Sequence, residues 1–163
     1  MPVKAFQAAQ VKSLYEKHGS ALAAYLCCGG MDFAAAEDVV QQVFLKLLEG
    51  NVSMPQMPAP YLYRAVRNAG LNYRRKAQRE VNLPDDDQWL VATGGRPDEV
   101  LAVQRALRQL PEEQRETVFL KIWGGLTLQE IGELLEIPIN TAASRYRYAI
   151  EKLREHLKPL PER

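Results

Sequence analysis

The sequence is poor in cysteine and histidine, and it has no long hydrophobic run. Two cysteines in 163 residues are too few for a framework of disulfides. No apolar stretch approaches the ~20 residues that a membrane-spanning helix needs. The first twenty residues also lack the apolar core of a signal peptide. These absences predict a cytoplasmic protein without membrane insertion or disulfide stapling.

Signatures of catalysis are missing as well. There is no glycine-rich phosphate loop, no Ser/His/Asp set and no pair of carboxylates, so we expect no enzyme, no cofactor and no bound metal. Cys27 and Cys28 are adjacent and would point in different directions from a helix, which favours buried small side chains over a redox or metal pair. His18 and His156 are far apart with no nearby ligand set, and we expect both at the surface.

The net charge of +1 conceals an uneven distribution. Residues 1–80 carry ten basic and six acidic side chains, residues 81–100 carry one and five, and residues 101–163 carry ten and nine. The acidic stretch also contains two prolines and two glycines, which is typical of a linker. We therefore predict two domains, 1–80 and 98–163, joined by an acidic linker at 81–97. The aspartates at 85–87 are interpreted as solvated linker residues rather than as a magnesium site.

Alternating strand patterns are absent, and apolar residues recur at helical spacing. The sequence therefore predicts an all-α fold. In the first domain we expect helices over 8–26, 34–49 and 61–79. The three prolines of 51–60 exclude a helix interior there. The predicted buried faces are Leu14, Leu22 and Leu26 in the first helix, Val40, Val43, Phe44, Leu47 and Leu48 in the second, and Leu62, Ala65, Val66, Ala69 and Tyr73 in the third.

The second domain ends in a helix-turn-helix pattern. Helices are expected from residue 98 and from Pro111, and a capping box at Thr127 opens the next one. Its buried face would be Ile131, Leu134 and Leu135. After a turn, Asn140 or Thr141 is predicted to cap a last helix with Ala142, Tyr146, Ala149, Ile150, Leu153 and Leu157 inward. Gly132 would allow the two helices to cross closely. The pattern favours DNA binding, although an ordinary helical hairpin with a solvated face remains an alternative.

The segment 61–79 gives a second, independent indication of nucleic acid binding. It contains six basic residues, no acid and three interleaved tyrosines. Arginine and lysine follow phosphates, and tyrosine rings stack on unpaired bases. The alternative is a solvated face with tyrosines in the core.

Three segments in order carry a resemblance to a known family. AEDVVQQVFLKL, YLYRAVRNAGLNYRRK and the stretch from LPEEQRETVF to YAIEKLR resemble the sigma-70 family of RNA polymerase sigma factors. The resemblance is to the short extracytoplasmic-function group, which has only the sigma-two and sigma-four domains. It covers residues 15–157, including the linker.

The resemblance implies partners and site residues. It implies binding to core RNA polymerase, through the beta-prime clamp helices and the beta flap, to promoter DNA, and to an anti-sigma factor. The polar face expected to dock on the clamp helices is Asp38, Gln41, Gln42 and Lys46. The minus-ten element would be bound by Asn51, Tyr61, Arg64, Arg67, Asn68, Asn72, Arg74, Arg75 and Arg79. The minus-thirty-five element would be bound by Asn140, Thr141, Ala143, Ser144, Arg145, Arg147 and Tyr148.

Several positions depart from the family pattern. Ala143 replaces a basic residue, and Tyr148 stands where an arginine is common. Glu136 stands where glycine is usual in the turn, Asn72 replaces a common aspartate, and Tyr61 replaces a common tryptophan. Ala143 and Tyr148 predict a less basic, more apolar surface that faces a thymine methyl group. The alternative function is a stand-alone helix-turn-helix regulator, for which neither a dimerisation surface nor a ligand pocket is visible.

Overall fold

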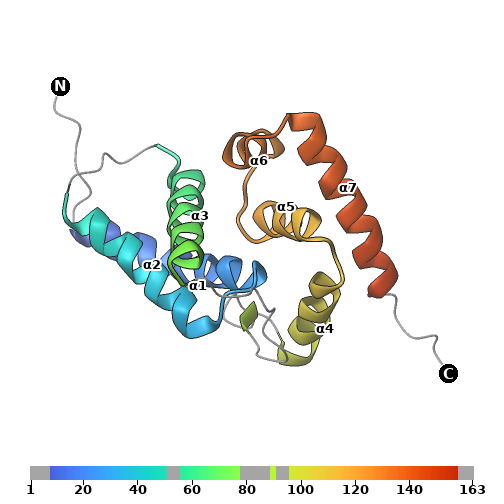
Figure 1. The fold of residues 1–163 in the computed structure, drawn as a ribbon, viewed down its shortest axis with the longest axis horizontal. Helices are drawn as coiled ribbons and strands as arrows, with labels where there is room; N and C mark the ends of the chain where they lie inside the picture. The colour runs from blue at the N-terminus through green and yellow to red at the C-terminus, as the bar shows by residue number, and fades with distance from the viewer. Residues whose placement is uncertain (1–7, 51–55, 78–88, 91–95, 158–163) are drawn as a thin grey trace. The chain divides into compact units, whose positions relative to one another are not determined.

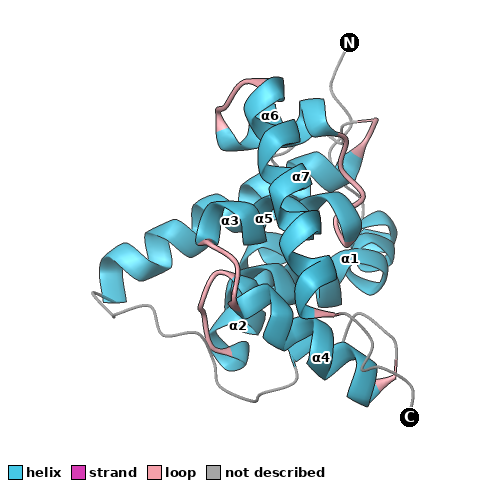
Figure 2. Ribbon diagram, turned by 90° about the vertical axis from the view of Figure 1, so that its right-hand side faces the viewer, coloured by secondary structure: helices cyan, strands magenta, loops and turns pink. Residues whose placement is uncertain are grey.

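The computed structural model describes residues 8–50, 56–77, 89–90 and 96–157. Within these residues there are seven α-helices and no strand (Figure 2), so the predicted all-α fold is confirmed. The chain divides into two compact units, residues 1–84 and 85–163. The predictions for Asn51, Arg79 and the aspartates at 85–87 lie outside the described residues.

The described residues of the first unit form three helices (Figure 1). They are α1 (Ala8–Cys28), α2 (Phe33–Leu48) and α3 (Pro58–Ala77), and each packs against the other two. Leu22, Leu47 and Leu62 are almost fully buried at their centre, and burying each such side chain stabilises the fold by roughly 1.5–3 kcal/mol. The apolar spacing of the sequence accounts for this bundle, because the inward positions predicted for α1 are all buried.

Helix α2 begins one residue earlier than predicted. Asp32 is its N-cap, and the Asp32 carboxylate accepts a hydrogen bond of 2.8 Å from the Ala35 amide. Gly50, at φ 79°, follows its C-terminal end as predicted. The prediction for Leu48 was wrong, since this side chain is 48% exposed at the edge of the bundle.

Helix α3 departs further from the prediction. It begins at Pro58, inside the proline-rich stretch, because the amides of a first turn have no helical partner and prolines are tolerated there. Its buried residues are Leu62, Tyr63, Val66 and Gly70, whereas the predicted Ala65, Ala69 and Tyr73 are half-buried. Gly70 admits α1 closely, since a Cβ there would lie 2.7 Å from Leu26 Cδ2.

The second unit packs three helices against a fourth. Helices α4 (Pro97–Arg108), α5 (Glu112–Ile122) and α6 (Leu128–Leu135) all contact α7 (Ile139–His156). Pro111 was predicted to be the first residue of α5, but it is the N-cap, one position earlier in the helix. Arg115 is buried and donates hydrogen bonds to the carbonyls of Leu107 (3.0 Å) and Leu110 (2.8 Å). It therefore satisfies the carboxyl end of α4 from within α5.

The turn between α6 and α7 is tightly constrained. Both hydrogen bonds of the predicted capping box at Thr127 are present. Glu136 ends α6 in the left-handed conformation, at φ 58°. Gly132 accepts a hydrogen bond from the Ile137 amide, and a Cβ at Gly132 would lie 2.8 Å from the Ile137 carbonyl oxygen. The close approach predicted at Gly132 is therefore made to the turn backbone.

The beginning of α7 corrects one prediction. Its N-cap is Pro138, so Asn140 and Thr141 lie in the first turn and neither is the cap. Ala142, Ala149 and Leu153 form the buried seam as predicted. Leu157 instead lies after the last turn and is 38% exposed.

Two residues before α4 are buried although the linker pattern predicted solvated chain. Trp89 and Leu90 are 2% and 1% exposed. The Leu90 amide donates a hydrogen bond of 3.2 Å to Oε1 of Gln104, a buried side chain of α4. The second unit therefore extends to residues that precede its first helix.

Candidate nucleic-acid and protein interfaces

The outward face of α7 carries the residues predicted to read DNA. Because Ala142, Ala149 and Leu153 fix the inward side, Asn140, Arg147 and Tyr148 are exposed. Thr141, Ala143, Ser144 and Arg145 are half-buried around them. The amino-terminal half of α7 thus presents small and polar side chains, as a helix that enters a major groove does.

The two arginines of this face have different surroundings. Arg145 lies 3.7 Å from the Glu113 carboxylate of α5, and its side chain is 25% exposed. The Arg147 guanidinium carbon lies 5.2 Å from the centroid of the Tyr148 ring, within the range of a cation–π contact. Arg145 is therefore directed toward α5, and Arg147 lies against its neighbour on the outer surface.

A polar stripe runs along the solvent side of α3. Arg64, Asn68, Asn72 and Arg75 are exposed at spacings that place them on one face of a helix. Helix α3 contains no acidic residue. The stripe can therefore bind phosphate oxygens through its arginines and base edges or phosphates through its asparagines.

Three of the α3 residues predicted to bind DNA, Tyr61, Arg67 and Arg74, are half-buried. The Arg74 guanidinium donates a hydrogen bond to the Gly29 carbonyl, just after α1. Arg74 therefore ties α3 to the end of α1. Tyr61 is half-buried, and its partial burial raises the pKa of its phenol.

Tyr63 belongs to the core rather than to the surface. It is 1% exposed and packs edge to face on Tyr25, with the ring centroids 5.3 Å apart. Burial raises the pKa of its phenol strongly. The other two tyrosines of this segment, Tyr61 and Tyr73, are half-buried, so they keep partly exposed side chains, as stacking on bases requires.

The polar face of α2 is fully accessible. Asp38, Gln41, Gln42 and Lys46 are all exposed, as a docking face requires. Leu45 lies on the same side and is 58% exposed, which the sequence reasoning missed. The sequence did contain a signal for this exposed leucine, because Leu45 is an apolar residue among the polar positions of the helix face. The face thus combines an apolar centre with a polar surround, the composition of a protein interface.

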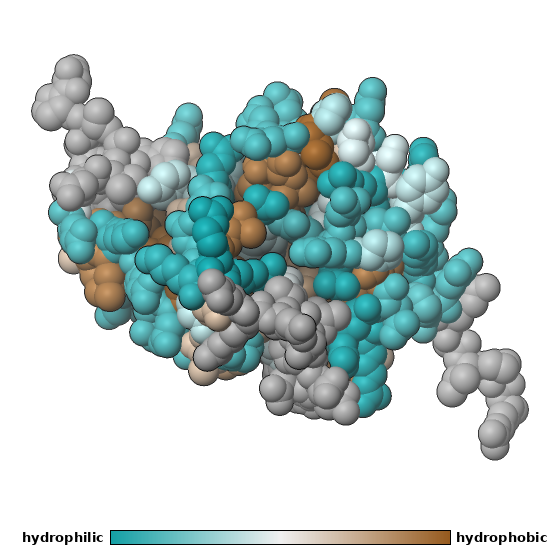
Figure 3. All heavy atoms as spheres, in the orientation of Figure 1, coloured by the Kyte–Doolittle hydropathy of each residue, from teal (hydrophilic) through white to brown (hydrophobic). Residues whose placement is uncertain are grey.

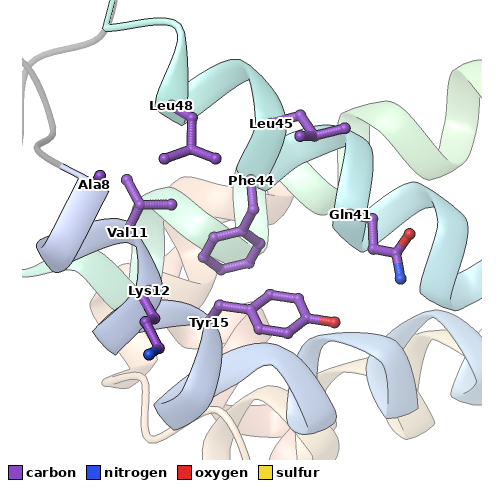
Figure 4. Close-up of a pocket in the computed structure, with 8 residues that line it drawn as sticks. All are labelled: Ala8, Val11, Lys12, Tyr15, Gln41, Phe44, Leu45 and Leu48. Atoms are coloured by element: carbon purple, nitrogen blue, oxygen red, sulfur yellow. The ribbon is translucent and has the colours of Figure 1, made fainter.

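A shallow apolar groove adjoins this face between α1 and α2 (Figure 4). Its volume is about 420 Å³. The rings of Tyr15 and Phe44 meet edge to face with their centroids 5.2 Å apart, and Lys12 and Gln41 lie at opposite sides of the groove.

The space-filling view shows that apolar side chains on the viewed face form separate small patches among polar ones (Figure 3).

The burial of the cysteines and histidines can be compared with the sequence predictions. Cys27 and Cys28 are buried, as predicted. His156 is exposed, but His18 is half-buried, and its burial together with nearby Lys17 lowers the pKa of its imidazole.

In the described part of the chain, no cluster of three or more His, Cys, Asp or Glu side chains could hold a metal ion. None of the helices described is long and apolar enough to cross a bilayer.

Comparisons with known proteins cover both units. Residues 14–80 match Sigma-70 region 2, and residues 101–153 match Sigma-70, region 4. The chain is 30% identical to the ECF RNA polymerase sigma factor SigL of Mycobacterium tuberculosis, over 96% of this chain and 93% of that protein. It is 27% identical to the ECF RNA polymerase sigma factor SigW of Bacillus subtilis, over 77% of this chain and 76% of that protein.

Solved structures show the same fold. The sigma factor RpoE of Bartonella quintana, solved with the anti-sigma factor NepR, superposes with a TM-score of 0.68 and 23% identity, covering 90% of this chain and 96% of that one. CnrH, solved with the cytosolic domain of CnrY, gives a TM-score of 0.63 and 21% identity, covering 91% and 88%. By its sequence relatives and its two matched regions, the chain belongs to the extracytoplasmic-function group of sigma-70 family RNA polymerase sigma factors.

Proposed function

We propose that this chain is a promoter-specificity subunit, which binds core RNA polymerase and directs initiation through minus-ten and minus-thirty-five elements. One observation carries the proposal. The chain contains both sigma-70 regions, and it has two separate helical faces suited to binding DNA. One is the acid-free stripe of α3 and the other is the outer face of α7. The chain itself performs no catalysis in this proposal.

The face of α2 is the proposed contact with the clamp helices of the beta-prime subunit. Asp38, Gln41, Gln42 and Lys46 would supply its polar contacts, and Leu45 would supply apolar area at its centre. Burying a half-exposed leucine on binding stabilises a complex by removing apolar surface from water. The beta flap would be contacted by the second unit.

The two DNA contacts are proposed to differ in kind. The α3 stripe, with Arg64, Asn68, Asn72 and Arg75, would bind the minus-ten element mainly through phosphates while a flipped base is held nearby. The first turns of α7 would enter the major groove of the minus-thirty-five element. Arg74 is assigned a structural role here, because it bonds to Gly29.

Run-off transcription with core polymerase tests the proposal against a stand-alone regulator. The purified chain is added to core enzyme on a library of genomic fragments. A sigma factor will co-purify with the core enzyme and produce transcripts from a subset of fragments. A stand-alone regulator will bind DNA without core enzyme and start no transcript, and that result would refute the proposal.

A double variant tests the α2 face. Asp38→Ala with Gln41→Ala removes two exposed polar side chains, so stability should change by less than about 0.5 kcal/mol, while affinity for core polymerase falls. Ser13→Ala with Ser20→Ala, two exposed polar residues of α1, is the matched control and should bind as the parent does. Equal affinity of both double variants in a pull-down would show that this face is assigned wrongly.

We also propose that an anti-sigma factor binds the chain in the cytoplasm. The support is that two of the solved structures that share this fold, the RpoE and CnrH structures described above, are complexes with the anti-sigma factor NepR and with the cytosolic domain of CnrY, respectively. Size fractionation of a cytoplasmic extract should then find the chain in a complex that lacks polymerase subunits. Finding it only alone or with polymerase would argue against this partner.

A further inference from the structure

We infer that Tyr148 is a positioning residue, which orients the Arg147 guanidinium for reading one base pair of the upstream promoter element. The inference rests on the proposed function, because it deepens the role of α7 there. It differs from the sequence prediction for Tyr148, which placed this side chain directly against DNA.

The geometry that carries it is the contact between the two side chains. The guanidinium carbon of Arg147 lies 5.2 Å from the Tyr148 ring centroid, and attraction of a cation to a ring face extends to about 6 Å. Both side chains are exposed on the outer surface of α7. Within the described part of the chain Arg147 makes no ion pair, so the Tyr148 ring is what restrains its guanidinium there.

An aromatic ring is well suited to orienting an arginine because it leaves the N–H donors of the guanidinium available. A guanidinium stacked on a ring face keeps the N–H groups at its edge directed outward. Those donors are the ones that bind guanine O6 and N7 together. A carboxylate partner would occupy the same donors. An arginine that is already restrained also loses less side-chain freedom when it binds DNA.

The neighbouring arginine shows the contrast. Arg145 is two residues earlier, three-quarters buried, and 3.7 Å from the Glu113 carboxylate. Its charge is therefore directed to α5 and positions α7 within the unit. Arg147 is the arginine of this turn that remains available to a base pair.

The experiment uses the full chain bound to core polymerase and DNA selected from a random duplex library. Binding to every single-base variant of the selected upstream element is measured for the parent, Arg147→Ala, Tyr148→Ala, Tyr148→Phe and the double Ala variant. Arg147→Ala should reduce discrimination at one base pair by about 5- to 150-fold. Tyr148→Ala should reduce it at the same base pair by about 2- to 5-fold. Tyr148→Phe, which keeps the ring, should behave as the parent.

The double variant separates positioning from direct contact. If Tyr148 acts through Arg147, removing the ring changes nothing further once Arg147 is alanine. Additive losses, a loss at a different base pair, or a loss in Tyr148→Phe equal to that in Tyr148→Ala would each overturn the inference. Failure of the parent holoenzyme to select any sequence would instead refute the proposed function. Circular dichroism of each variant confirms that the helices are intact.

Discussion

Replacing Gly132 by alanine should destabilise the second unit, although alanine is the better helix former. In a helix interior, glycine to alanine normally stabilises a protein by about 1 kcal/mol. At Gly132 the new Cβ would lie 2.8 Å from the Ile137 carbonyl oxygen, which belongs to backbone and cannot rotate away. Displacing a packed group in this way costs about 1–3 kcal/mol. The amide of Ile137 also donates a hydrogen bond of 2.9 Å to the Gly132 carbonyl, so a shift of this turn backbone would disturb that bond as well.

After the gain from helix propensity is subtracted, the net expectation is a loss of up to about 2 kcal/mol in the free energy of unfolding, measured by urea unfolding with far-UV circular dichroism. Gly19→Ala is the matched control. Gly19 is also a buried helical glycine, but its nearest neighbour to a new Cβ would be the Tyr15 ring at 3.5 Å, an ordinary contact. That variant should gain up to about 1 kcal/mol. Equal or greater stability of Gly132→Ala relative to the parent would refute the argument that the turn backbone requires glycine.

Three further changes have expected outcomes. Glu136→Gly should stabilise the protein by roughly 0.5–1 kcal/mol, seen as a higher urea midpoint, because φ 58° is unfavourable for a side chain. Thr127→Ala should cost about 1 kcal/mol and lower the melting temperature, because the capping box is lost. The pKa of His18 is lowered in the folded protein, so the parent should lose stability as the pH falls below about 6.5, the pKa of an unfolded histidine. His18→Gln should reduce this loss, whereas His156→Gln, at an exposed position, should not. Thermal melts at a series of pH values around and below about 6.5 measure the difference.

Local patterns were enough to predict most of the helices. The spacing of Val40, Phe44 and Leu47 identified the buried side of α2 because a 3.6-residue period repeats over four turns. Thr127 and Glu130 identified the start of α6 because a capping box involves only residues three apart. Such features depend on neighbours in sequence, and the structure confirms them.

Features that depend on distant partners were not predictable in this way. Arg115 and Gln104 have polar side chains and are nevertheless buried, where they bond to backbone groups eight and fourteen residues away in sequence, respectively. Tyr63 lies among basic residues, and its place in the core depends on packing against α1, where its ring meets Tyr25. The stripe on α3 was predicted as a basic segment, but the bond from Arg74 to the Gly29 carbonyl joins residues 45 apart in sequence, which no local pattern reports.

The burial of Trp89 and Leu90 makes the attachment of this short segment to α4 observable by fluorescence. The Leu90 amide donates a hydrogen bond to Oε1 of Gln104 in α4, so both residues stay buried while this contact is made. If the contact opened, the Trp89 indole, which is 2% exposed in the folded unit, would enter water. A change in Trp89 fluorescence would therefore report the detachment of residues 89–90 from α4.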